Sequence, residues 1–213
     1  MFRSIVILPG IFLAAVLVLC DCAPLLAQEA DADSSWSFSV SGSFTVTPHS
    51  GVILSPGFSV DHNWLHAETR YNYEDVRTAS FFAGYWLGVG NKLRLDAAPM
   101  IGFVVGQTNA FAPALEFTLT YWKLTLYSEQ ELIINYEGKD ESYLYSWNEL
   151  TYAVTRKLFL GISGQRTRLY QSGLDLQKGP MVKYLFGKFT GTFYAFNPFS
   201  DHNVFAGTLS MDF

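Results

Sequence analysis

Charged side chains stand at every second position in several otherwise apolar segments of this chain. His66, Glu68 and Arg70 have this spacing, so they would share one face of an extended strand. A charge held against lipid costs about 2–4 kcal/mol, so we expect such residues to face an enclosed interior. The candidate lumen-lining charged residues are His66, Glu68, Arg70, Lys92, Arg94, Asp96, Glu116, Glu129, Glu131, Glu149 and Lys183.

These charges fit two kinds of interior. One is a narrow or gated water-filled passage for small solutes or ions, and the other is a closed scaffold whose lumen holds a salt-bridged network. Acidic candidates outnumber basic ones, so an open passage would weakly favour cations. Large side chains would narrow the lumen at Phe82, Trp86, Tyr127 and Phe159.

Catalysis is the third possibility. Two Asp-His neighbours occur, Asp61-His62 in a predicted turn and Asp201-His202 in a predicted loop at the opposite end. His49 could approach the second pair on the outer rim, as a hydrolase-type acid–base pair or a metal site requires. The sequence has no Gly-rich phosphate loop, cysteine metal cluster or EF-hand spacing. We therefore predict no enzyme activity, no cofactor and no metal site, with the rim site as the alternative.

Apolar and polar residues alternate over lengths of about ten residues, as strands of a barrel require. The chain is 49% hydrophobic and 16% aromatic, yet after residue 27 no apolar run approaches the roughly 20 residues of a spanning helix. In the clearest case, Trp36, Phe38 and Val40 alternate with Ser37 and Ser39. We predict an all-β fold, a single antiparallel transmembrane β-barrel, because closure leaves no backbone group unpaired in a bilayer. A soluble β-sandwich is the alternative.

The last predicted strand, residues 203–213, ends on an aromatic residue. One of its faces carries Phe205, Gly207, Leu209, Met211 and Phe213. This pattern resembles the terminal strand of Gram-negative bacterial outer-membrane β-barrel proteins, whose final Phe helps the assembly machinery recognise the chain. The resemblance implies a location in the bacterial outer membrane, contact with its lipid and lipopolysaccharide, and the barrel assembly machinery as a partner. It implies an assembly signal in these five residues.

We expect about twelve strands, with ten or fourteen as alternatives. Their approximate ranges are 36–46, 52–60, 64–74, 78–89, 92–105, 110–121, 123–134, 143–154, 157–168, 179–187, 188–196 and 203–213. Short periplasmic turns should alternate with longer outer loops, placing both termini in the periplasm. Because the outer loops are short, we expect none of them to form a folded plug. Pro56 and Pro99 lie inside predicted strands and should cause a bulge or an early strand end.

The first 27 residues have the features of an export signal, with Arg3 before an apolar run and Ala27 at the expected cleavage site. Both cysteines lie within this segment, so the mature chain would have no disulfide. Residues 28–35 are predicted to be a flexible periplasmic leader, and residues 36–213 the barrel. The formal net charge of -5 argues against a nucleic-acid partner.

Overall fold

The computed structural model describes residues 36–47, 51–138, 141–168 and 176–213, and its long regular elements are all β-strands. They are β1 (Trp36–Thr47), β2 (Gly51–His62), β3 (Leu65–Tyr71), β4 (Thr78–Tyr85), β5 (Leu87–Val89), β6 (Leu93–Gly106), β7 (Ala110–Tyr121), β8 (Leu124–Asn135), β9 (Tyr143–Ala153), β10 (Leu158–Arg166), β11 (Gln177–Phe186), β12 (Phe189–Phe196) and β13 (Val204–Asp212). Within these ranges no helix is long and apolar enough to cross a bilayer. The predicted signal (1–27), the predicted leader (28–35) and His49 lie outside the described residues.

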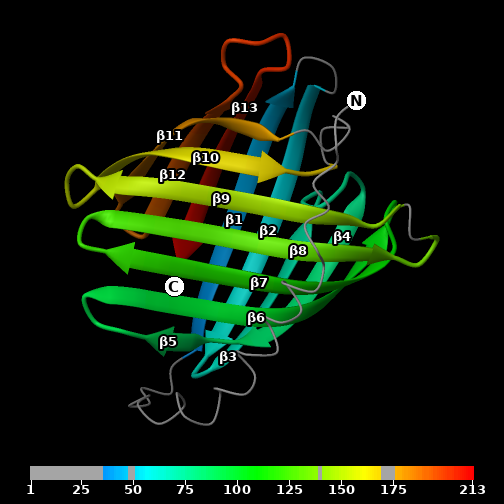
Figure 1. Ribbon diagram of the computed structural model, residues 1–213, viewed down its shortest axis with the longest axis horizontal. Coiled ribbons are helices and arrows are strands. Elements are labelled where there is room, and N and C mark those ends of the chain that lie inside the picture. The colour runs from blue at the N-terminus through cyan, green and yellow to red at the C-terminus, as the bar shows by residue number, and fades with distance from the viewer. Residues whose placement is uncertain (1–35, 48–50, 139–140, 169–175) are drawn as a thin grey trace, which may run out of the picture.

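The strands close into one antiparallel barrel (Figure 1). Strand β1 pairs with β13 from Ser39↔Asp212 to Val46↔Phe205. On the other side of the ring, β4 pairs with β6 and completes the closure. A closed ring leaves no sheet edge with free N–H and C=O groups, which is the requirement for a sheet in hydrocarbon. The predicted all-β barrel is confirmed.

Strands β4 and β5 share one position in this ring. Both pair with β6 in a single register, β4 up to Gly84 and β5 from Leu87. Pro99 of β6 faces the break between them, and proline has no N–H to donate across it. Because β5 continues β4, the thirteen strand segments occupy twelve positions, as predicted.

The two prolines do not bulge or end their own strands, so that expectation is wrong. Strand β2 runs through Pro56, which pairs with Gly42 of β1, and β6 runs through Pro99, which pairs with Leu115 of β7. The missing N–H groups fall on the other side of each strand. On that side of Pro56, the ladder between β2 and β3 stops at Gly57. On that side of Pro99, the strand paired with β6 is interrupted between β4 and β5.

Alternate residues of each strand face the lumen and the outside. On β1, Ser39, Ser41 and Ser43 line an interior cavity, while Val40 and Phe44 are exposed on the outer surface. Other outward side chains are also large and apolar, with exposed fractions of 54% for Phe81, 59% for Ile101 and 61% for Ile162. An apolar outer band around a polar interior is the pattern of a barrel with lipid on its outside.

The two ends of the barrel differ. The short connections β2–β3, β5–β6, β7–β8, β9–β10 and β11–β12 lie together at one end, which we call the turn end. The opposite end, which we call the loop end, carries the connections that include residues 72–77 and 197–203. Phe38 and Phe213 lie at the turn end, where each N–H donates to the other residue's carbonyl at 2.9 Å. The predicted asymmetry of turns and loops is therefore present.

Deleting Phe213 should lower the amount of folded barrel in the outer membrane and leave precursor in the periplasm. The deletion removes both backbone bonds to Phe38 and a ring stack at 5.8 Å, at the seam where the first and last strands meet. Heat-modifiable gel mobility of membrane fractions measures the folded amount. Phe199→Ala is the control, because that side chain is fully exposed in a loop and should have no effect. Wild-type levels after the deletion would rule out Phe213 as an assembly signal.

Candidate functional site in the barrel lumen

A buried arginine organises the lumen. Arg70 of β3 contacts Glu129 and Glu131 of β8 through Nη1, the second at 2.6 Å. Its Nε and Nη2 donate to the two carboxylate oxygens of Glu68, with Nε–Oε2 at 3.1 Å. Glu74 approaches Nη1 at 3.5 Å. We call these five residues the Arg70 cluster.

In the Arg70 cluster, carboxyl groups outnumber basic groups. Four carboxylates surround one guanidinium, and the exposed fraction of the Arg70 side chain is only 7%. The guanidinium also lies against two aromatic rings, with Cζ 4.4 Å from the Tyr73 centroid and 5.0 Å from the Phe82 centroid. Arginine suits this position because its planar fork can donate to several carboxylates while its face packs on rings.

The segment 72–77, which joins β3 to β4 at the loop end, folds into the lumen. Asn72 and Arg77 flank it in the left-handed region, with φ of 52° each, and they turn the chain inward. The Asn72 N–H donates to the Thr78 carbonyl at 2.9 Å and closes the neck of the segment. We call residues 72–77 the inward segment.

Contacts from three sides hold the inward segment. The hydroxyl of Tyr143 on β9 donates to the Glu74 carbonyl at 3.1 Å, and Thr167 donates to the same carbonyl at 3.3 Å. Thr108 donates to the Asp75 carboxylate at 2.7 Å. Ser80 of β4 donates to the Glu74 carboxylate at 2.7 Å. The sequence analysis expected no folded plug, and this segment is only six residues long, but it enters the lumen and contacts the wall from inside.

Apolar packing completes the obstruction at the loop end. Val76, at the tip of the inward segment, packs against a buried cluster from β2, β11, β12 and β13. The members of that cluster are Ile53, Met181, Tyr194, Phe196, Val204 and Ala206. Burial raises the pKa of Glu74 to about 7, partly offset by Arg70 and by the bond from Ser80.

Among the described residues, the lumen holds a polar cavity and a larger cavity of mixed lining. The smaller, of about 200 Å³, is lined by His66, Glu68 and Glu116 among others. The larger, of about 430 Å³, extends along β9 to β13 and includes Glu149 and Lys183. The two cavities have Ser41, Ser43, Ser55, Tyr73 and Tyr127 in common. They thus meet along one wall, where the Tyr73 hydroxyl, from the inward segment, donates to Glu129 at 3.0 Å.

A second ion pair stands in the larger cavity. The Lys183 ammonium donates to Glu149 at 2.9 Å, and the same carboxylate accepts bonds from Tyr194 at 2.5 Å and Trp147 at 3.0 Å. Every acceptor oxygen of Glu149 therefore has a partner. This pair is balanced in charge, so the negative excess lies on the Arg70 side of the lumen.

The remaining predicted site residues lie elsewhere. Lys92 is exposed in the turn before β6, and Arg94 pairs with Asp96 at 2.7 Å near the turn end, with Arg94 58% exposed. His62 stacks on Trp36 at the turn end, with ring centroids 4.3 Å apart. The pair Asp201-His202 is exposed at the loop end. The structure thus brings together the candidates of β3, β7 and β8 but not those at the start of β6.

The inward segment is the part of the site that the sequence analysis missed. Tyr73 and Glu74 continue the alternation of β3, and the predicted strand accordingly extended to residue 74, whereas β3 ends at Tyr71. The one local signal was Asn72, a residue type that tolerates a positive φ and so can end a strand.

Solved structures with this architecture are outer-membrane porins. KdgM porin matches with a TM-score of 0.56 at 10% sequence identity, over 82% of this chain and 99% of that one. KdgM porin in complex with disordered oligogalacturonate matches with a TM-score of 0.56 at 11% sequence identity, over the same shares of the two chains. The chain has the fold of outer-membrane porins. The Acinetobacter baumannii outer membrane protein Omp33 matches with a TM-score of 0.50 at 12% identity, over 85% of this chain and all of that one. No protein-family model and no curated protein matches the sequence. At these identities the likeness concerns the fold alone.

Replacing Arg70 by Met should lower the free energy of unfolding by about 3–5 kcal/mol, because four buried carboxylates would lose their shared cation. Urea unfolding in lipid vesicles, followed by tryptophan fluorescence, measures the change. Arg94→Met is the matched control, since its pair with Asp96 is exposed and should leave stability close to that of the wild type. Equal stability of the two variants would contradict the role given to Arg70.

Proposed function

We propose that this protein is a narrow, gated passage for small solutes or ions across the bacterial outer membrane. The observation that carries the proposal is the pair of adjoining cavities in a porin-type barrel, obstructed at the loop end by the inward segment. Twelve strands leave less room than the sixteen or more of open porins, so a single short segment suffices to obstruct the lumen.

The charges of the lumen favour cations or small neutral solutes. Glu68, Glu116 and Glu129 line the smaller cavity, where Arg70 is the one basic counterpart among the described lining residues. A cavity with acidic walls concentrates cations and repels anions. KdgM porin was solved with oligogalacturonate, a polyanion. The present lumen has the opposite electrostatic preference, so we do not extend that ligand class to this chain.

The inward segment is the proposed gate. The segment joins the ends of β3 and β4. It contacts the wall through hydrogen bonds, through the approach of Glu74 to Arg70, and through the packing of Tyr73 and Val76. Such a segment can leave the lumen without breaking any ladder between strands. The gate therefore opens at the cost of local contacts only.

A closed scaffold is the second candidate, favoured by the Arg70 cluster itself. This cluster ties β3 to β8 through the lumen, as a barrel built for rigidity would. Ion conduction separates the two functions. We expect the reconstituted wild type to conduct in planar bilayers, with a reversal potential of the cation-selective sign under a salt gradient. A complete lack of conductance would favour the scaffold, and an anion preference would contradict the acidic passage.

Tyr143→Phe should raise the fraction of time spent open. The change removes the hydroxyl that donates to the Glu74 carbonyl and leaves the ring in place. Loss of one hydrogen bond of about 1 kcal/mol corresponds to roughly a fivefold shift in the ratio of closed to open states. Single-channel recordings measure that ratio. Tyr121→Phe, an exposed tyrosine at the turn end, is the control and should behave as wild type. An unchanged ratio in Tyr143→Phe would exclude the inward segment as the gate.

A further inference from the structure

His66, at the start of β3, is fixed in one orientation. It is 4% exposed, and its Nδ1 lies 2.7 Å from Asp61 Oδ1 on the neighbouring strand β2. The same Asp61 oxygen accepts a bond from the Trp86 indole at 2.6 Å. The Trp86 ring also packs edge-on against the imidazole, with centroids 5.2 Å apart. Rotation of His66 would break its contacts with Asp61 and with the Trp86 ring.

This arrangement determines which imidazole nitrogen is available. A carboxylate beside Nδ1 holds the proton on that nitrogen, so Nε2 keeps its lone pair. His66 Nε2 is buried and has no hydrogen-bond partner among the described residues. A buried nitrogen without a partner is unfavourable, so its persistence calls for an explanation. A carboxylate behind the imidazole and a free Nε2 in front of it are the features of a metal-ligating histidine.

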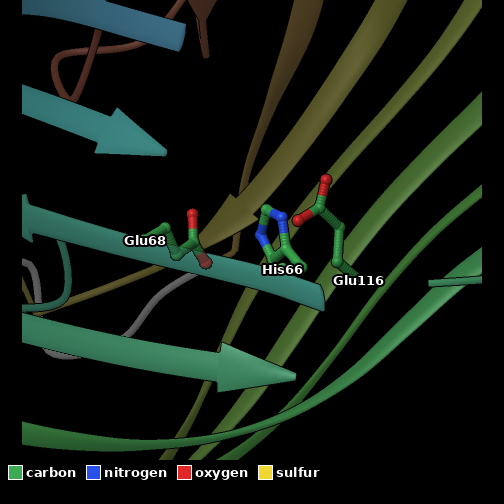
Figure 2. A group of neighbouring side chains, drawn as sticks. All are labelled: His66, Glu68 and Glu116. Atoms are coloured by element: carbon green, nitrogen blue, oxygen red, sulfur yellow. The ribbon is translucent and has the colours of Figure 1, made fainter. Parts of the chain in front are cut away.

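Two carboxylates lie close to this imidazole. Glu68 is two residues further along β3, on the same inward face, and Glu116 comes from β7. A ligand atom of each residue lies within 4.8 Å of those of the other two. Figure 2 shows the imidazole of His66 between the two carboxylate groups. One ion at the centre of the three atoms could contact all of them after small side-chain movements.

Small residues allow β3 and β7 to approach across the lumen. These strands are not neighbours, because β4 and β6 lie between them. The register places Gly84 of β4 beside His66 and Ala98 of β6 beside Glu116. Neither has a side chain long enough to fill the space between the imidazole and the Glu116 carboxylate. The site is thus built by four strands.

The electrostatics also favour a cation here. Glu116 adds a fifth carboxylate beside the four of the Arg70 cluster, and Arg70 is already shared among its own partners. Glu68 belongs to both groups, since its oxygens accept from Arg70 while its carboxylate faces His66. A bound cation would offset part of this negative excess.

We propose that His66, Glu68 and Glu116 bind a divalent transition-metal ion in the lumen. Imidazole with carboxylates suits zinc and its first-row neighbours, whereas calcium and magnesium prefer oxygen ligands alone. Three protein ligands leave a further coordination position open, and all three residues line the cavity of about 200 Å³. Asp61 is the positioning residue that orients His66. The site goes beyond the proposed passage and does not depend on conduction.

Zinc binding to the folded barrel tests the proposal. The protein is refolded in detergent, treated with a chelator, exchanged into buffer and titrated with Zn²⁺ by calorimetry. We expect one ion per barrel. His66→Gln and Glu116→Gln should each weaken binding at least 100-fold, and Asp61→Asn should weaken it 10- to 100-fold, as loss of an outer partner does elsewhere. His202→Gln and Glu149→Gln are the matched controls and should bind as wild type.

Two further readouts keep the result decisive. Heat-modifiable mobility shows that each variant is folded before titration. X-ray absorption of the zinc-loaded wild type should show one imidazole nitrogen with oxygen ligands, and a shell of oxygens alone would overturn the assignment. Failure of the wild type to bind Zn²⁺, equal affinity in His66→Gln, or equally tight binding of Ca²⁺ would also overturn it. Since no membrane current is measured, a non-conducting barrel that binds zinc would reject the passage and keep the site.

Discussion

The lumen of this barrel depends on the charge of Arg70. Removal of a carboxylate from water is costly, and four of them converge on this single guanidinium from β3, from β8 and from the inward segment. Because the partners come from β3, from β8 and from the inward segment, the interaction ties that segment to both strands. The same interaction leaves more carboxyl groups than basic groups around Arg70, and this makes the wall of the smaller cavity acidic.

The closed ring makes such an interior possible. Strand pairing satisfies the backbone around the whole barrel, so the inward face of every strand is free to carry polar groups. Several positions on β4, β6 and β7 carry small side chains that leave space in the lumen, namely Gly84, Ala98, Ala112 and Ala114. Long side chains from β3 and β8 can then meet across it. The Arg70 cluster thus depends on small residues on β4, β6 and β7 and on long side chains on β3 and β8.

Period-two alternation was enough to predict the strands and the inward face of β3, because a strand has a single geometric repeat. It failed at Tyr73 and Glu74, which keep the same alternation although the backbone turns at Asn72. It also missed the approach of Glu116 to His66, residues that lie on non-adjacent strands. The prediction of no metal site relied on ligands close together in sequence. Ring closure brings ligands together that no local spacing reveals.

One face of one strand connects the two ends of the lumen. Along β3, His66, Glu68 and Arg70 point inward in succession, and Arg70 then reaches Glu74 of the inward segment. Glu68 is the shared member, since it faces His66 on one side and Arg70 on the other. In a low-dielectric interior, a charge placed beside His66 acts on its neighbours more strongly than it would in water. Glu68 thus lies between His66 near the turn end and Arg70, which approaches the segment at the loop end.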